Sequence, residues 1–326
     1  MKYRISQDDY IGGGTQKDFY DINDVKECTC LICGANNYTI LHSERGNLRI
    51  VRCNECDLIY TNPRAKDSEN NYFGDADIFL DEARLIFKGK KKHHRDKNYI
   101  SELRIIKKLK PKGKLLDIGT NMGFFLRKAK DLGYDVQGVE PSPSLSKIAS
   151  EQFNLNIKNS FFEASSFSQK EFDIITMIDV FEHITNPIEL LKHAFIVLKD
   201  DGILCIKVPN GNYNILKLKL SRLFQKKDNH DIFNSYEHVG HYTPETMKII
   251  LDKTGFQVKK FTIPLPIHPP IWANLVGHYY QYPSPFILDW KRIILRNLFW
   301  QLGKLENIFG LKVNFAPDLF FIISKI

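Results

Sequence analysis

The sequence lacks any apolar run that could cross a membrane. Its longest stretch without Asp, Glu, Lys or Arg is Phe261–Leu288, and prolines interrupt this stretch repeatedly, at positions 264, 266, 269, 270, 283 and 285. Those prolines would break a spanning helix. The first residues, MKYRISQDDYIGGG, contain no apolar core of the kind found in secretory signal peptides. Internal repeats and low-complexity tracts are also absent, and we therefore expect a cytoplasmic globular protein.

The composition is close to that of an average soluble protein. The 326 residues are 43% hydrophobic and 26% charged, which excludes a disordered or fibrous chain. Basic residues outnumber acidic ones by 46 to 38, a formal net charge of +8. Much of this excess lies in Lys88–Lys97 and in a second cluster between Lys217 and Lys227. Such runs usually lie on solvated faces, but they also suit phosphate, nucleic acid or a membrane surface.

Four of the six cysteines form two C-x2-C pairs. These are Cys30 with Cys33 and Cys53 with Cys56, with nineteen residues between the pairs. This spacing allows four thiolates to surround one Zn²⁺ ion tetrahedrally. We predict a structural zinc ribbon, remote from any chemistry, with a disulfide or redox role as the alternative. Cys28 could replace Cys30 as a ligand, and Cys205 lies in an apolar strand pattern typical of a core.

The order of patterns predicts the domain organisation. We expect an N-terminal arm at residues 1–27, a zinc ribbon at 28–66, a helical linker or lid at 67–111 and a larger domain at 112–326. The larger domain would carry insertions at about 210–242 and 263–312. Within the ribbon, YTILHS and LRIVRC read as two strands joined by the turn-like ERGN.

Strand and helix patterns alternate through the larger domain. Strand patterns occur at 114–119, 134–140, 172–179, 202–209, 256–263 and 318–325, and helical patterns at 122–131, 143–150, 187–199 and 244–255. Strands separated by helices predict an α/β fold with a doubly wound, mostly parallel sheet.

The first of these strands ends in a turn suited to ligand binding. LLDIGTNMG places Asp117 in the strand and Gly119 and Gly123 in the turn before a helix, and the next strand ends at Glu140. A carboxylate about twenty residues after such a turn can accept both hydroxyls of a ribose. A dinucleotide-binding fold would also fit a two-glycine turn, but the G-x-G-x-x-G pattern is absent.

These motifs together resemble the class I S-adenosylmethionine-dependent methyltransferases. LLDIGTNMG resembles the first motif of that family, with Asn121 in place of the usual middle glycine, and GVEPS resembles the second. FDIITMIDVFEHITNP, LKDDGILCIKVPN and HVGHYTPETMKIILDKTGFQV resemble later motifs of its small-molecule subgroup. A zinc ribbon before such a domain is similar to bacterial sugar- and surface-polysaccharide-modifying methyltransferases.

The resemblance implies roles for the matching residues. Asp117 would support the turn and the amino-acid end of S-adenosylmethionine, and Glu140 would bind its ribose. Backbone at Gly119, Asn121 and Gly123 would approach the cofactor, and Asp179 would lie beside its methionine portion. The residue that contacts adenine is not assigned, although Ser160–Glu163 lies in a suitable place.

The stretch SYEHVGHY is the candidate for acid–base chemistry. It contains Tyr236, Glu237, His238 and His241, and it resembles the Tyr, Glu and His set with which some sugar C-methyltransferases remove a substrate proton. His238 backed by Glu237 is one candidate base and His241 is another. His183 of the FEH motif is a further candidate catalytic residue. The alternative is that these residues only hold the loop, and that His183 caps or packs a helix.

We therefore predict methyl transfer from S-adenosylmethionine to a sugar hydroxyl, or to a carbon, on a nucleotide-, lipid- or glycan-linked saccharide. The alternative is an RNA methyltransferase that holds RNA with the ribbon and the basic runs. IDVFEH argues against it, because nucleic-acid amino methyltransferases usually carry Asn/Asp-Pro-Pro-aromatic there. Two amphipathic segments, 214–224 and 285–309, suit packing over the active site, a homodimer face or peripheral membrane contact.

Overall fold

The computed structural model describes residues 17, 19–66, 86–88, 93, 95–223, 231–266 and 286–326. For 286–293 it describes the backbone only. Parts of the predicted N-terminal arm, of the linker at 67–111 and of both insertions therefore lie outside the described residues. The same is true of 89–92 and 94 in the first basic run and of 224–230, which includes the end of the second.

A seven-stranded sheet forms the centre of the molecule, in the order β12-β13-β10-β9-β6-β7-β8. The pairing of β13 with β10 and with β12 is antiparallel, and the remaining pairs are parallel, which confirms the prediction of a mostly parallel sheet. The strands are β6 (Lys114–Ile118), β7 (Asp135–Val139), β8 (Asn156–Lys158), β9 (Phe172–Ile178), β10 (Leu198–Pro209), β12 (Phe256–Thr262) and β13 (Asp318–Lys325).

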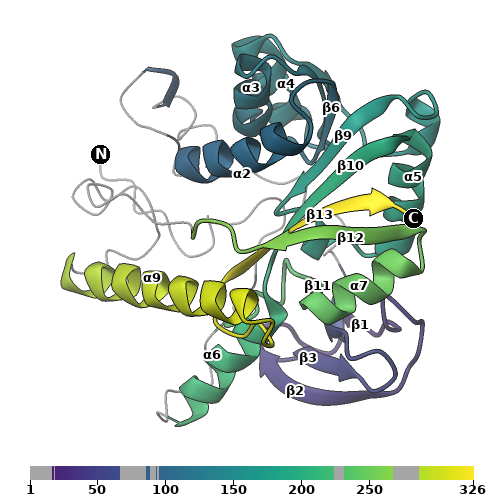
Figure 1. The fold of residues 1–326 in the computed structure, drawn as a ribbon. Helices are drawn as coiled ribbons and strands as arrows, with labels where there is room; N and C mark the ends of the chain where they lie inside the picture. Colours follow the sequence, from purple (N-terminus) through teal and green to yellow (C-terminus); the bar gives the residue numbers. More distant parts are fainter. Residues whose placement is uncertain are drawn as a thin grey trace, which may run out of the picture.

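Helices cover both faces of this sheet (Figure 1). Alternate residues of a strand point to opposite faces. Leu204 and Ile206 of β10 therefore join one apolar cluster, whereas Ile203 and Cys205 join the other. The first cluster lies under α5 (Pro187–Val197) and α7 (Pro244–Asp252), and the second under α2 (Asp96–Leu109), α3 (Phe124–Asp131) and α4 (Pro143–Phe153). Cys205 is fully buried there, as its apolar surroundings predicted.

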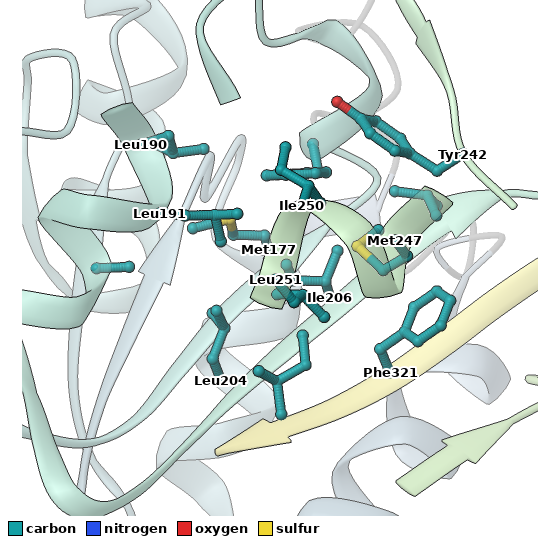
Figure 2. Close-up of a cluster of buried hydrophobic side chains, with 14 of the residues drawn as sticks. Met177, Leu190, Leu191, Leu204, Ile206, Tyr242, Met247, Ile250, Leu251 and Phe321 are labelled. Carbon is teal, nitrogen blue, oxygen red and sulfur yellow. The ribbon is translucent and has the colours of Figure 1, made fainter. Parts of the chain in front are cut away.

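Figure 2 shows the first cluster. Leu190 and Leu191 of α5 and Ile250 of α7 meet side chains of β9, β10 and β13, and all of these are at least nine-tenths buried. Burying a large aliphatic side chain stabilises the fold by about 1.5–3 kcal/mol. The packing of α5 and α7 therefore holds β9 and β10 in place, and residues of the candidate site lie at or just beyond the carboxyl ends of the sheet strands.

The four-cysteine segment forms a second sheet, of order β11-β4-β3-β2. We call it the four-cysteine sheet; its strands are β2 (Tyr38–Glu44), β3 (Leu48–Cys53), β4 (Ile59–Thr61) and β11 (Gly240–His241). The predicted turn is present, with Arg45 and Gly46 at φ 47° and 84°. Two further short strands, β1 (Val25–Lys26) and β5 (Arg64–Ala65), pair with each other.

This element was expected to lie apart from the reacting groups, but the structure places it against the candidate acid–base stretch. Its edge strand β4 pairs with β11, which contains His241 of the candidate acid–base stretch. Cys30, Val51 and Tyr60 also belong to the same apolar cluster as the residues under α5 and α7. The four-cysteine sheet and the larger domain thus share one core.

The two amphipathic segments are the helices α6 (Gly211–Leu223) and α9 (Phe286–Ile308). On α9, several large apolar side chains are at least 48% exposed, namely Ile294, Leu295, Leu298, Leu305 and Ile308. Among the described residues, no helix is long and apolar enough to span a membrane. The exposed side chains leave both the dimer face and the membrane-surface interpretation of α9 open.

Candidate active site

The turn between β6 and α3 brings the backbone close to its neighbours. Gly119 and Gly123 have φ values of 72° and 81°, which suit glycine. A Cβ on Gly119 would lie 2.5 Å from Val180, and one on Gly123 would lie 2.8 Å from Leu155. Asn121 is also left-handed, at φ 52°, and its side-chain oxygen accepts a 2.7 Å hydrogen bond from the N–H of Met122. Asparagine tolerates this conformation, so its departure from the family motif preserves the turn.

Glu140 lies directly against this turn. Its carboxylate accepts hydrogen bonds from the N–H groups of Asn121, at 2.8 Å, and Ser142, at 2.9 Å. The side chain is 6% exposed, and burial raises its pKa. Each carboxylate oxygen has a second lone pair, so both can still accept a hydrogen bond from a ligand hydroxyl. Glu140 therefore lies beside the turn, as the resemblance implied, and its ribose role stays a prediction.

Asp117 is buried behind the turn rather than open to a ligand. Its carboxylate accepts a 2.6 Å hydrogen bond from the hydroxyl of Thr176, and burial raises its pKa to about 7. Its backbone carbonyl accepts from the hydroxyl of Thr120 at 2.8 Å. One contact comes from the neighbouring strand β9 and the other from the turn itself, and both fit the predicted support of the turn.

Asp179 follows β9 and lies in a buried cluster of charges. It pairs with Arg95, which precedes α2, and with Lys207 of β10, whose Nζ is 3.1 Å from Asp179 Oδ2. Lys207 also lies 3.5 Å from Glu102 of α2. Burial alone would raise the pKa of Asp179, but the charges of Arg95 and Lys207 outweigh it and hold this pKa below its usual value. The carboxylate that the resemblance places beside the cofactor is thus kept ionised.

Two of the predicted histidines are in contact. The rings of His183 and His238 meet edge to face, with centroids 4.8 Å apart, and His183 Nδ1 lies 3.0 Å from the carbonyl oxygen of Glu237. Burial lowers the pKa of His183 to about 4 and that of His238 well below its usual value. Both are therefore neutral near pH 7, and the same burial makes each a weaker base than a free imidazole. His241 lies one step further, its ring centroid 6.3 Å from that of His238.

Glu182, beside His183, was missed by the sequence analysis. It is 2% exposed, and its Oε2 has no hydrogen-bond partner among the described residues. Burial raises its pKa well above the usual value, and Asp179 adds to the effect. Glu182, His183 and His238 each offer a ligand atom, and these atoms lie within 4.8 Å of one another. The three could hold a metal ion, or share protons with a bound acceptor.

Tyr236 is not brought to the histidines. Its ring packs on Tyr20, with centroids 5.5 Å apart, in a small buried cluster that includes Leu48 of the four-cysteine sheet. The carboxylate of Glu237 accepts a 2.7 Å hydrogen bond from Asn234 and does not back His238. These contacts of Tyr236 and Glu237 favour the alternative that the two residues hold the loop.

The four predicted metal ligands lie together. The Sγ atoms of Cys30, Cys33, Cys53 and Cys56 are all within 4.8 Å of one another, and the pairs Cys30–Cys56 and Cys33–Cys53 are 3.4 Å apart. Gly34 and Asp57 follow the two pairs at φ 74° and 61°, as the knuckle turns require. Cys28 lies outside this group and contacts the carbonyl oxygen of Thr61. The geometry favours Cys30 over Cys28 as a metal ligand.

Comparison with known proteins gives the family. Residues 92–260 match the family described as "Methyltransferase domain". A ubiquinone biosynthesis O-methyltransferase of Coxiella burnetii (strain RSA 493 / Nine Mile phase I) is 31% identical over 108 residues, which are 31% of this chain and 46% of that protein. The corresponding protein of Glaesserella parasuis serovar 5 is 28% identical over 174 residues, 43% of this chain and 73% of that protein.

The chain thus spans about half the length of the first curated relatives it matches (46%). Among solved structures, a SAM-dependent methyltransferase of Archaeoglobus fulgidus is similar at 21% identity and a TM-score of 0.46, covering 76% of this chain and 99% of the other. The family match alone extends over more than half of the sequence, from within the predicted linker into β12. The chain belongs to the methyltransferase-domain family.

Proposed function

We propose that this protein transfers a methyl group from S-adenosylmethionine to a hydroxyl group of a small-molecule acceptor. The observation that carries the proposal is the pairing of Glu140 with the Gly119–Gly123 turn at the edge of a methyltransferase-family sheet. In an open α/β sheet, ligands bind beyond the carboxyl ends of the strands where the topology reverses. Here the reversal falls between β6 and β9, and both Glu140 and Asp179 lie at that edge.

The residues present fit the proposed cofactor. Gly119 and Gly123 leave no space for a Cβ because the turn packs against Val180 and Leu155, and a glycine turn of this kind would let backbone approach a ligand. Glu140 would accept the ribose hydroxyls, and Asp179, at the end of β9, would lie beside the methionine portion of the cofactor. S-adenosylmethionine supplies an electrophilic methyl group on a sulfonium when it is bound.

The histidine pair supports the transfer of a proton from the acceptor. A hydroxyl that gains a methyl group must lose its proton, and a neutral imidazole is a suitable base near pH 7. The burial that lowers the pKa of His238 keeps it neutral. We assign the base to His238, with His183 held against it by the backbone of Glu237.

The acceptor that we propose is a sugar hydroxyl on a nucleotide-, lipid- or glycan-linked saccharide, with a sugar carbon as the less favoured target. The small-molecule form of the IDVFEH motif and the histidine pair support this class. The relatives named for O-methylation in ubiquinone biosynthesis favour oxygen over carbon as the methylated atom. We propose further that a structural zinc ion is held by the four clustered cysteines.

The test is methyl transfer from S-adenosylmethionine labelled in its methyl group to a panel of acceptors. The panel contains nucleotide-linked deoxysugars, lipid-linked saccharides, a ubiquinone-biosynthesis acceptor and an RNA transcript. We expect label in a saccharide, at oxygen. Label in the ubiquinone acceptor or in the RNA alone would overturn the sugar assignment, and binding of the cofactor without transfer to any acceptor would count against the activity itself.

A further inference from the structure

The loop that carries the histidines lies between two parts of the molecule. We call residues 231–241 the histidine loop. On the side of the central sheet, the N–H of Val239 donates to the carbonyl of Glu182 at 2.9 Å, and His183 contacts the carbonyl of Glu237. These contacts hold one side of the histidine loop against the FEH motif. They do not hold the opposite side of the loop.

The four-cysteine sheet holds that other side. Gly240 and His241 pair with Tyr60 and Ile59 as the outer strand of the sheet. The hydroxyl of Thr61 donates a 2.8 Å hydrogen bond to the carbonyl of His238, and the N–H of Thr61 donates to Val239 at 3.1 Å. The backbone of the proposed base is therefore bonded directly to the strand that follows the second cysteine pair.

Glu44, at the end of β2, holds the start of the same loop. Its carboxylate accepts hydrogen bonds from the N–H groups of Ile232, Phe233 and Ser235, at 2.9, 2.8 and 3.0 Å. The side chain is only 4% exposed, so few water molecules could replace it. Three backbone donors converging on one buried carboxyl fix the path of a loop that contains no regular structure before β11.

We propose that Glu44 and Thr61 are positioning residues for His238, so that the four-cysteine sheet forms one wall of the active site and sets where the acceptor's proton is received. The inference rests on the proposed function, because it gives these two residues a part in proton removal. It also explains why a small cysteine-rich sheet precedes this methyltransferase domain: the sheet reaches the reacting edge through its own edge strand.

The chemistry of Glu44 provides a conservative variant. Burial raises the pKa of Glu44 to about 8, and the neighbouring Asp231 adds to the effect. Asp231 is itself paired with Arg45 at 2.6 Å, and Lys217 also lies near Glu44. At pH 7 a glutamine is therefore close to the neutral carboxyl in charge and shape. Its side-chain oxygen can accept from Ile232 and Phe233, whereas its amide nitrogen cannot accept from Ser235. Alanine, in contrast, would remove all three acceptor contacts.

The experiment compares Glu44→Ala, Glu44→Gln and Thr61→Val with Glu27→Ala, an exposed carboxylate of the same part of the chain. Hydrogen–deuterium exchange of residues 231–241 and the imidazole NMR signals of His238 are measured, with calorimetry of S-adenosylhomocysteine binding. We expect Glu44→Ala to speed exchange in the loop at least about tenfold, to shift the His238 signals and to leave the calorimetric affinity unchanged. With an acceptor from the panel, kcat should fall about 10–100-fold.

Glu44→Gln should restore most of the wild-type signals and turnover, and Glu27→Ala should change neither. Wild-type loop exchange and wild-type His238 signals in Glu44→Ala would overturn the inference. If Glu44→Ala does not fold, Thr61→Val decides, because it removes one hydroxyl without changing side-chain shape. If no acceptor in the panel is methylated, the proposed function fails, while exchange and NMR still test the positioning of the loop.

Discussion

The ammonium group of Lys207 lies 3.1 Å from the carboxylate of Asp179 and is completely buried. The charges of Asp179 and Glu102 raise the pKa of Lys207 despite the opposing effect of burial, so the lysine stays protonated. Removing one partner of a buried ion pair leaves the other charge uncompensated. This pair therefore joins the strand β10 to Asp179, the residue proposed to lie beside the cofactor. The stability of the fold depends on both Lys207 and Asp179.

Lys207→Met should lower the free energy of unfolding by about 3–5 kcal/mol, as measured by chemical denaturation. Lys199→Met is the matched control on the same strand. Its ion pair with Asp173 is 2.8 Å long, but the lysine is 39% exposed, so the loss should be about 1 kcal/mol or less. Equal losses in the two variants would show that burial of the Lys207 pair has no special cost.

Glu140→Ala should weaken the binding of S-adenosylhomocysteine by about 2–4 kcal/mol, because a carboxylate that accepts two ribose hydroxyls makes charge-assisted hydrogen bonds. Isothermal calorimetry measures the change. Glu151→Ala, an exposed carboxylate on α4, should bind as the wild type does. Unchanged affinity in Glu140→Ala would remove this residue from the site.

Protein purified without chelator should contain about one equivalent of zinc, and Cys30→Ser should lower both the zinc content and the melting temperature. Cys28→Ser is the control, because Cys28 lies outside the group of four sulfur atoms. Metal analysis by mass spectrometry gives the content. Less than half an equivalent in the wild type would contradict the assignment, as would equal zinc loss in the two variants.

His238→Ala should reduce turnover about 10²–10⁴-fold while the affinity for the cofactor product stays the same. His241→Ala should reduce it less, because the ring of His241 packs on Phe233, with centroids 5.1 Å apart. Single-turnover kinetics with the acceptor identified in the panel separates the two. Full turnover in His238→Ala would show that another residue acts as the base.

The buried His241 should make stability fall in acid. Burial lowers its pKa to about 3, whereas an unfolded histidine titrates near pH 6.5. Between these values the unfolded state binds the proton and the folded state does not, so this group's contribution is lost as the pH falls below about 6.5. The free energy of unfolding should fall by about 1 kcal/mol per pH unit just below pH 6.5.

Urea denaturation of the wild type and of His241→Phe at pH 7.5 and 5.5 measures this contribution. The variant should lose less stability than the wild type on acidification, and His193→Phe, a half-buried histidine on α5, serves as control. Equal losses in the wild type and His241→Phe would show that His241 is protonated in the folded state as well.

Much of the fold follows from local patterns. The strand and helix patterns of the larger domain appear as predicted, with β6 to α3 and β7 to α4 in the expected order. The helix predicted from Met122 begins instead at Phe124, because Gly123 is left-handed and cannot continue a helix. The strand β8 was not predicted; it has only three residues, none of them fully buried, and so no apolar alternation.

The candidate site was predictable where a motif is contiguous in the sequence. The turn at Gly119–Gly123 and Glu140 could be found because they follow consecutive strands. Lys207 could have been singled out from the sequence, because it is a lone lysine in an apolar strand pattern. Arg95 was missed because it belongs to the basic run Lys88–Lys97, and such runs usually lie on solvated faces. Glu44 left no signal, since its partners Ile232 and Phe233 are 188 and 189 residues away.

The position of β13 has a consequence for synthesis on the ribosome. This strand is inserted between β10 and β12, and in the described part of the chain β13 is the one strand with which β12 pairs. While residues 318–325 are still unmade, β10 presents an unpaired apolar edge, and β12 has no strand to bind. Exposed edges of this kind recruit other chains. We therefore expect a nascent chain stalled before β13 to be prone to aggregation, although most strands of its sheet have been translated.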